Sequence, residues 1–327
     1  MKSKKMILVA MLACLFVPAM AQSKESKEEV KGKAIVQVFG NFHTGFGKEN
    51  DQRGFELERS YLGYQYDFND GLSMKAVMDI GQSSEVNDYH RIAYIKNAMV
   101  TWKKGNFTLN GGLISTTQFN MQEKFWGNRY IMKSFQDLYK FGSSADLGVS
   151  ASYSCAPWIS MDAIIVNGEG YKKVQVNDGL LYGLGVTLQP NKGLTFRVYG
   201  GFNEASEDGK KNTYNEAIFL GYENQTYSVG GEYVLMQNAS NVENKDQKGI
   251  SFYGNINLNS KVSLYVRYDE LFSKDDWNIK DEQAIITGVQ FKLGKYVKLA
   301  PNFRMVMPRA EGQANKYSAY ISCYFGN

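Results

Sequence analysis

Charged side chains recur at every second position in several segments of the chain, between apolar neighbours. In the segment 297–308, for example, Lys298, Asn302 and Arg304 alternate with apolar residues. A period of two places the polar and the apolar sets on opposite faces of a strand. The polar faces of all such segments carry eight cations, namely Arg59, Lys75, Arg197, Arg267, Lys292, Lys298, Arg304 and Lys316, and five acids, namely Asp67, Asp79, Asp162, Glu232 and Asp269.

This excess of positive charge predicts an electrostatic role. A wall with more cations than acids raises the local concentration of anions. We therefore expect the cationic residues to line a water-filled space and to favour anions there. A mixed-charge wall that holds water with little selectivity is the alternative.

Residues for ordinary catalysis are scarce. The chain has 2 His and 3 Cys, with no cluster of these types that would bind a metal. His43 stands at the end of a predicted strand and His90 in a polar loop, and no nucleophile signature lies near either. We expect no enzyme activity, no metal and no cofactor; a hydrolase with a Ser–His pair would depend on one of these histidines.

The composition limits the class of fold. Of 327 residues, 43% are hydrophobic and 14% are aromatic, which excludes an intrinsically disordered chain. Three cysteines are too few for disulfide bonds to hold together a chain of this length, and we expect Cys155 and Cys323 to stay unpaired. The net charge of +4 is nearly balanced and argues against nucleic acid as a partner.

The N-terminus indicates a secretory signal peptide, residues 1–21. Three lysines precede a short apolar run at 6–17, and Ala19-Met20-Ala21 has the small-x-small spacing of a cleavage site. The run is too short to span a bilayer. A lipoprotein signal ending at Cys14 is the alternative. Residues 22–32 are charged and poor in apolar residues, which predicts a flexible periplasmic N-terminus.

The period of two returns along the whole chain from Lys33 onward. Each segment has the length that a membrane-crossing strand needs, about 9–11 residues, with some to spare. The pattern predicts sixteen strands, near 33–44, 54–68, 72–82, 92–103, 106–116, 145–154, 158–167, 179–189, 193–203, 214–223, 225–236, 248–259, 261–272, 282–293, 297–308 and 315–325.

The connections between these strands alternate in length. Short turns such as 69–71, 103–105 and 259–260 are followed by longer polar connections at 45–53, 83–91, 117–144, 168–178, 204–213, 237–247 and 273–281. Short turns at one end and long loops at the other are typical of an outer-membrane β-barrel. A propeller would instead show a repeat of about 40–50 residues, and none is visible.

The predicted fold is therefore all-β: a transmembrane antiparallel barrel of about sixteen strands over 33–327, with short periplasmic turns and longer extracellular loops. Closure removes the exposed strand edges of an open sheet. A barrel of this strand number is too wide to be filled by its own side chains and encloses water. We expect a porin in the bacterial outer membrane, and a non-conducting barrel for adhesion or surface structure is the alternative.

The longest connection, 117–144, is rich in large aromatic residues, including Phe125, Trp126 and Tyr130. Such side chains would be unprotected in solvent, so we expect this loop to fold into the barrel and narrow the pore. A lid on the outer rim and a subunit contact are the alternatives. In a constriction, the expected selectivity groups are Lys124, Arg129, Lys133 and Lys140, with Asp137 in opposition.

Five short stretches, in this order, resemble a known family: 55–63 (FELERSYLG), 96–100 (KNAMV), 110–113 (NGGL), 143–149 (SSADLGV) and 166–170 (VNGEG). They are similar to the phosphate-selective porin O and P family, in its outer-membrane porin form from Bacteroidetes-like bacteria. The resemblance implies a sixteen-strand homotrimer that favours anions such as phosphate. The family pattern around Arg59 is richer in arginine, and only Arg59 carries over.

The expected partners follow from this interpretation. They are outer-membrane lipid and lipopolysaccharide, the barrel-assembly machinery, small anionic solutes and two further copies of the chain in a homotrimer. The trimer rests on the resemblance alone.

Overall fold

The computed structural model describes residues 32–47, 50, 52–68, 70–82 and 90–327. The expected signal peptide, 1–21, and all but the last residue of the expected flexible N-terminus, 22–32, lie outside the described residues. Within the described ranges, no helix is long and apolar enough to cross a membrane.

Sixteen strands form one antiparallel sheet in the described part of the chain, which confirms the predicted fold. The first eight are β1 (Gly32–Phe46), β2 (Arg53–Asp67), β3 (Leu72–Gln82), β4 (Arg91–Lys104), β5 (Phe107–Ser115), β6 (Ala145–Ala156), β7 (Ile159–Val166) and β8 (Leu181–Leu188). The others are β9 (Leu194–Asn203), β10 (Thr213–Glu223), β11 (Tyr227–Gln237), β12 (Gln247–Asn257), β13 (Val262–Ser273), β14 (Glu282–Lys292), β15 (Val297–Pro308) and β16 (Lys316–Gly326).

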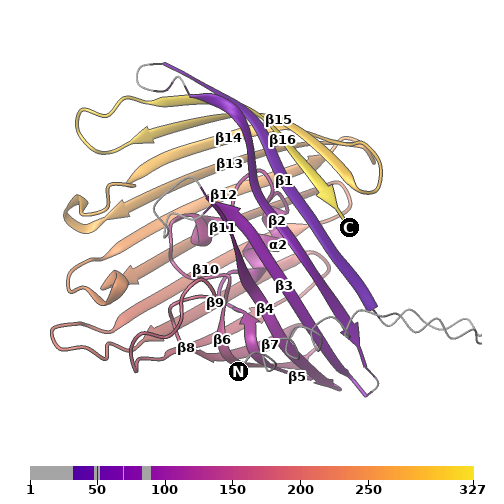
Figure 1. The fold of residues 1–327 in the computed structure, drawn as a ribbon, viewed down its shortest axis with the longest axis vertical. Helices are drawn as coiled ribbons and strands as arrows, with labels where there is room; N and C mark the ends of the chain where they lie inside the picture. Colours follow the sequence, from indigo (N-terminus) through magenta and orange to yellow (C-terminus); the bar gives the residue numbers. More distant parts are fainter. Residues whose placement is uncertain (1–31, 48–49, 51, 69, 83–89) are drawn as a thin grey trace, which may run out of the picture. The chain divides into compact units, whose positions relative to one another are not determined.

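The sheet closes on itself between its first and last strands (Figure 1). β1 pairs with β16 from Gln37 opposite Gly326 to Phe46 opposite Tyr317, and each other strand pairs with its neighbours in sequence. Closure leaves no unpaired edge that could add a strand from another chain. Four short helical segments lie in the connections: α2 (Asn120–Trp126), α3 (Phe135–Leu138), η2 (Ala239–Asn241) and η3 (Lys274–Asp276).

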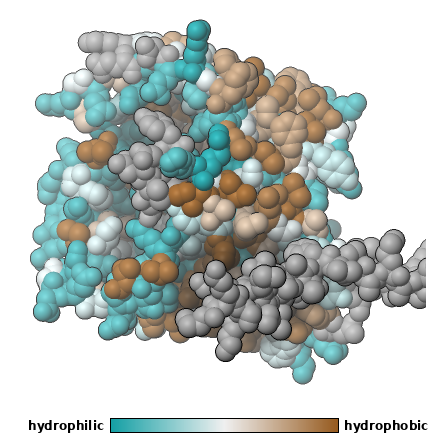
Figure 2. Space-filling model, viewed as in Figure 1, coloured by the Kyte–Doolittle hydropathy of each residue, from teal (hydrophilic) through white to brown (hydrophobic). Residues whose placement is uncertain are grey.

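The outer face of the barrel is apolar. Ile218, Leu220 and Val266 point outward and are 50%, 55% and 51% exposed. Figure 2 shows hydrophobic residues gathered on the upper right of the barrel and hydrophilic ones along its left edge, over the ends where Figure 1 draws long connections. An outer belt of this kind requires lipid around it, and a closed barrel with such a belt is a protein of the bacterial outer membrane.

Three β-bulges interrupt the strict alternation of faces in the described strands, one of them between Ser154 and Ala156 of β6, and the other two concern the site. Of these two, one lies where the β1–β2 register shifts between Phe39 and Gly40, and the other where the β3–β4 register shifts between Val77 and Met78. Each of these two shifts leaves one residue of the partner strand without an opposite residue: Glu58 in β2 and Lys96 in β4. A bulge re-aims the side chains around it. As a result, both Lys96 and its neighbour Asn97 reach inner-face groups, the Tyr61 hydroxyl and the Ser115 hydroxyl.

The connection between β5 and β6 lies inside the barrel, where Figure 1 draws α2. Its aromatic residues pack against the inner faces of β10, β12 and β13. Phe125 meets Phe219 at a ring-centroid distance of 5.1 Å, and Trp126 meets Tyr253 at 5.9 Å. Trp126 is fully buried and Phe125 is 3% exposed. The loop therefore forms a hydrophobic core with the barrel wall, and this core extends to Phe39 of β1 and Tyr61 of β2.

Candidate functional site

Three arginines of the barrel wall hold loop 117–144 by its backbone. Arg197 donates to the Thr117 carbonyl at 2.7 Å, Arg267 to that of Lys133 at 2.5 Å, and Arg304 to that of Ile131 at 2.8 Å. Because these bonds go to main-chain oxygens at the start of the loop and at its middle, residues 131–133, they fix its path across the lumen.

The prediction that Arg197 and Arg267 line open water is wrong. They are 3% and 1% exposed. Arg197 forms an ion pair with Asp162 at 2.6 Å, and Arg267 one with Asp269 at 2.6 Å. Both point inward, as the alternation of faces requires, but the loop covers them. Inward direction on a strand does not determine whether water reaches a side chain.

The other predicted wall cations are exposed or only partly covered. Arg304 stacks on the Tyr320 ring, 3.5 Å from its centroid. Lys298 lies opposite Lys292 in the β14–β15 ladder, and its ammonium is 5.2 Å from the centroid of the Tyr324 ring. Lys75 is half-buried on β3, and Lys292 and Lys316 are exposed at strand ends.

The five predicted loop residues divide into two groups. Arg129, Lys133 and Asp137 come together, with Arg129 2.7 Å and Lys133 3.7 Å from the Asp137 carboxylate. Lys124 and Lys140 are exposed and lie apart from them. Lys124 is 3.8 Å from Glu223 at the end of β10.

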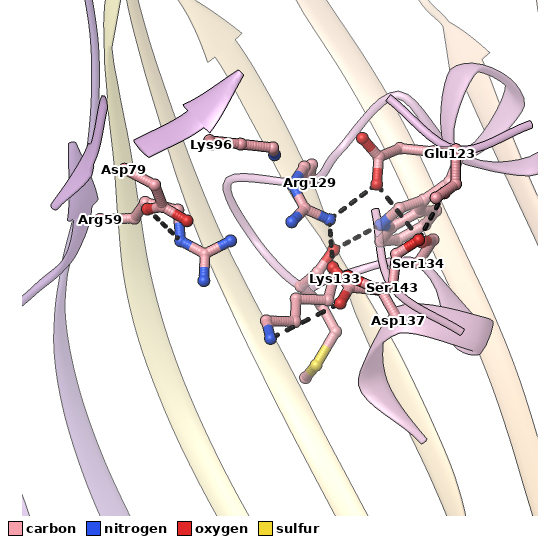
Figure 3. A network of polar contacts seen from close by, with 12 residues as sticks. Arg59, Asp79, Lys96, Glu123, Arg129, Lys133, Ser134, Asp137 and Ser143 are labelled. Atoms are coloured by element: carbon pink, nitrogen blue, oxygen red, sulfur yellow. Dashed lines mark hydrogen bonds and ion pairs between the residues drawn. The ribbon is translucent and has the colours of Figure 1, made fainter. Parts of the chain in front are cut away.

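Arg129 of the loop and two cations of the barrel wall share one hydrogen-bond acceptor, the phenolic oxygen of Tyr61. The Tyr61 hydroxyl accepts from Arg59 at 3.0 Å, from Lys96 at 3.1 Å and from Arg129 at 3.4 Å. Figure 3 shows Arg59 and Lys96 reaching from the strands towards Arg129 on the loop. We call Arg59, Tyr61, Lys96 and Arg129 the Tyr61 cluster.

Carboxylates partner the two arginines of the Tyr61 cluster. Arg59 lies 3.2 Å from Asp79, whose other oxygen accepts from the Tyr171 hydroxyl. Arg129 lies 2.6 Å from Glu123 in addition to Asp137. No carboxylate among the described residues forms an ion pair with Lys96. The charge of Lys96 is therefore the least compensated of the three.

Asp137 stays ionised because of its cationic neighbours. Burial by itself raises the pKa of Asp137, but the charges of Arg129 and Lys133 outweigh burial and hold that pKa at about 2. Burial lowers the pKa of Lys133, and the negative charge of Asp137 partly offsets this decrease. The Arg129–Asp137 pair is thus charged at every pH above about 3.

Two cavities open beside the Tyr61 cluster, and Arg129 lines both. The first cavity, of about 480 Å³, is bordered by the inner faces of β1–β4 and by α2. The second cavity, of about 400 Å³, is bordered by β1, β2 and the loop. Together their linings carry seven cations, Arg59, Lys75, Lys96, Lys124, Arg129, Lys133 and Lys172, and three acids, Glu56, Glu58 and Glu123.

Lys96, Tyr61 and Lys172 belong to this site without having been predicted for it. Tyr61 stands two residues after Arg59 on the same strand face, so its place could have been inferred from the alternation. Lys96 could not, because the bulge beside it breaks the period of two on which the prediction of faces depends. Lys172 comes from the connection after β7, and no strand pattern reaches it.

The histidines have ordinary structural surroundings. His43 Nδ1 lies 2.9 Å from the Asn41 side-chain oxygen, and its ring stacks on Tyr320 with centroids 5.2 Å apart. His90 is exposed, immediately before β4. Cys155 is exposed and Cys323 is half-buried, and both are free thiols.

Comparison with known proteins identifies the fold. No family model and no curated protein matches the sequence. Among solved structures, an anion-selective porin from Comamonas acidovorans aligns with a TM-score of 0.67 at 12% identity, over 90% of this chain and 99% of its own. OmpF of Salmonella typhi, in complex with daunomycin, aligns at 0.70 and 8% identity over 90% and 97%. The outer-membrane channel DcaP of Acinetobacter baumannii aligns at 0.66 and 13% identity over 94% and 100%.

Proposed function

We propose that this sixteen-strand outer-membrane barrel is a porin: a water-filled channel for passive diffusion of small hydrophilic solutes, with a preference for anions. Its structural neighbours are outer-membrane porins and channels. The observation that carries the proposal is the pair of cavities that meet at Arg129, with seven cations and three acids in their linings.

The geometry makes this charge excess effective. In 0.1 M salt, screening acts over about 10 Å. Cavities of about 480 and 400 Å³ leave a solute no path that far from the lining charges. An anion is therefore attracted throughout the passage, while a cation meets net repulsion. Asp79 and Asp137 reduce the excess behind Arg59 and Arg129, but they leave it positive.

Phosphate, or an oxyanion of similar shape, is the solute that we propose. Three N–H donors converge on the Tyr61 oxygen from three directions, and phosphate oxygens accept from the same kind of donor set. The resemblance of 55–63 to phosphate-selective porins supports this assignment through Arg59. The carboxylates of Glu56 and Glu58, which line the second cavity, repel phosphate, so we expect only modest selectivity for phosphate.

We further propose a homotrimer embedded in lipid and lipopolysaccharide after insertion by the barrel-assembly machinery. An OmpT from Vibrio cholerae, which aligns with a TM-score of 0.60 at 15% identity, is described in a trimer form. The exposed hydrophobic side chains on the outer face of the barrel offer surface for lipid and for subunit contacts. Chemical cross-linking of the purified protein in detergent tests the trimer.

Two measurements test the porin proposal. Insertion of the purified barrel into a planar bilayer should give discrete conductance steps, and proteoliposomes should take up radiolabelled phosphate faster than potassium. Absence of both signals would exclude a porin and favour the alternative of a non-conducting barrel for adhesion or surface structure.

A further inference from the structure

A third cavity lies on the other side of loop 117–144 from the first and second cavities. Its volume is about 460 Å³, and it shares Thr116 with the first cavity. Its lining joins the loop, the long-loop ends of β6–β12 and several long connections. The residues that matter for its chemistry are Tyr139, Phe141, Glu169, Tyr199, Asn203, Asn215 and Trp277.

Two hydrogen-bond acceptors of this lining have no partner among the described residues. Asn215 is 7% exposed, and its side-chain nitrogen donates to the Phe141 carbonyl, but its oxygen accepts nothing. One carboxylate oxygen of Glu169 is likewise buried and unpartnered. Buried polar atoms are nearly always hydrogen-bonded. An occupant of the cavity that donates hydrogen bonds would satisfy both acceptors.

The same cavity has two further polar groups that can form hydrogen bonds with an occupant. The hydroxyl of Tyr199 and the side-chain amide of Asn203 line it, and no hydrogen bond joins either group to another residue in the described part of the chain. These two groups come from β9, Asn215 comes from β10, and Glu169 from the connection after β7. The polar groups thus converge from three elements.

Aromatic rings border the cavity in fixed positions. The Tyr139 hydroxyl donates to Glu282 at 2.9 Å, and the Trp277 indole donates to the Asp246 carbonyl at 2.8 Å. Phe141 stacks against Phe135, with centroids 5.6 Å apart. Tyr139 and Phe141 are almost fully buried, and the partly exposed Trp277 provides preformed apolar surface beside the polar groups, as in most small-molecule sites.

We propose that this cavity binds a neutral saccharide. A sugar supplies hydroxyl donors for Asn215 and Glu169, hydroxyl acceptors for Asn203 and Tyr199, and apolar C–H faces for the aromatic rings. The lining balances the carboxylates of Glu169 and Asp146 against the ammonium groups of Lys140 and Lys280, so it has no net charge that would select an ion over a neutral occupant. The volume lies within the range of about 300–1,000 Å³ for small-molecule sites.

Calorimetric titration of the detergent-solubilised barrel with glucose, maltose, cellobiose and N-acetylglucosamine tests this site. We expect saturable binding of at least one of the four. Tyr199→Phe and Glu169→Gln should each weaken it roughly fivefold, since each removes a hydrogen-bonding group. Tyr214→Phe is the matched control, because Tyr214 lies on the outer face and is 44% exposed.

Three results would overturn the proposal: no saturable binding of any of the four sugars, equal binding in both variants and the control, or displacement of the sugar by inorganic phosphate. Glu169 lies in a connection, so its variant leaves the barrel strands intact if Tyr199→Phe should fail to fold. The site does not depend on the porin proposal: sugar binding without conductance would sustain it, and conductance without sugar binding would contradict it.

Discussion

Replacement of Lys96 tests whether the Tyr61 cluster sets the anion preference. Lys96 lines the first cavity, and its ammonium lies 3.1 Å from the Tyr61 hydroxyl. Because no carboxylate among the described residues pairs with it, its charge acts on a passing solute with little compensation. Lys96→Gln should therefore lower the anion-to-cation permeability ratio.

The size of the effect follows from Coulomb's law. An anion that accepts a hydrogen bond from Lys96 lies roughly 4 Å from its charge, where the attraction is about 1 kcal/mol in water and about 4 kcal/mol at an effective dielectric constant of 20. The cavity is open to water, so we take the lower value, which corresponds to about a fivefold change. Lys96→Glu replaces attraction with repulsion, and the change should reach about 25-fold.

The assay is the reversal potential of single channels in a KCl gradient, measured for each variant. Lys316→Gln is the control, since Lys316 is exposed at the start of β16 and lines neither cavity. The reasoning is refuted if Lys96→Gln leaves the permeability ratio at the wild-type value, or if Lys316→Gln changes it as much.

Four further predictions concern loop 117–144. Arg267→Met leaves Asp269 buried without its ion-pair partner, at a cost of about 3–5 kcal/mol in folding free energy. The melting temperature measured by circular dichroism should therefore fall. An unchanged melting curve would contradict the anchoring role of Arg267. Trp126→Ala removes the fully buried ring at the centre of the loop, at a cost of about 3–5 kcal/mol in folding free energy. The loop should be released from the wall, and single-channel conductance should rise. Unaltered conductance would show that the loop stays in place without the Trp126 ring. Asp137→Asn leaves Arg129 and Lys133 less compensated and should raise the anion-to-cation permeability ratio, whereas an unchanged ratio would place the acid off the solute path. Because Asp137 has a lowered pKa of about 2, its contribution to holding the loop is fully present above its ordinary pKa, about 3.9, and should be lost as the pH falls towards 2; wild-type conductance that rises already at pH 5 would refute that assignment.

The sixteen strands and their closure could be predicted because their signals are local. Alternation within a strand depends on neighbouring residues, and the difference between short turns and long loops is visible directly in the sequence. The same local signal gave the correct face for Arg197 and Arg267, but it could not show that a distant segment covers them.

The details of the site depend on non-local features. Loop 117–144 packs on β10, β12 and β13 and, through Tyr130, on β1 and β16, yet open space remains beside the inner faces of β1–β4. No pattern in the loop specifies where that space remains. The bulge that brings Lys96 to Tyr61 arises from the pairing of β3 with β4. Lys96 therefore could not be inferred from alternate positions, whereas Arg59 on β2 could.

The most direct test of the central claim is the sign of the reversal potential of the wild-type channel in a KCl gradient. With seven cations and three acids around the path, we predict the sign of an anion-preferring channel and a shift when phosphate replaces chloride. A cation-preferring sign would contradict the account and would mean that Glu56, Glu58 and Glu123 determine selectivity.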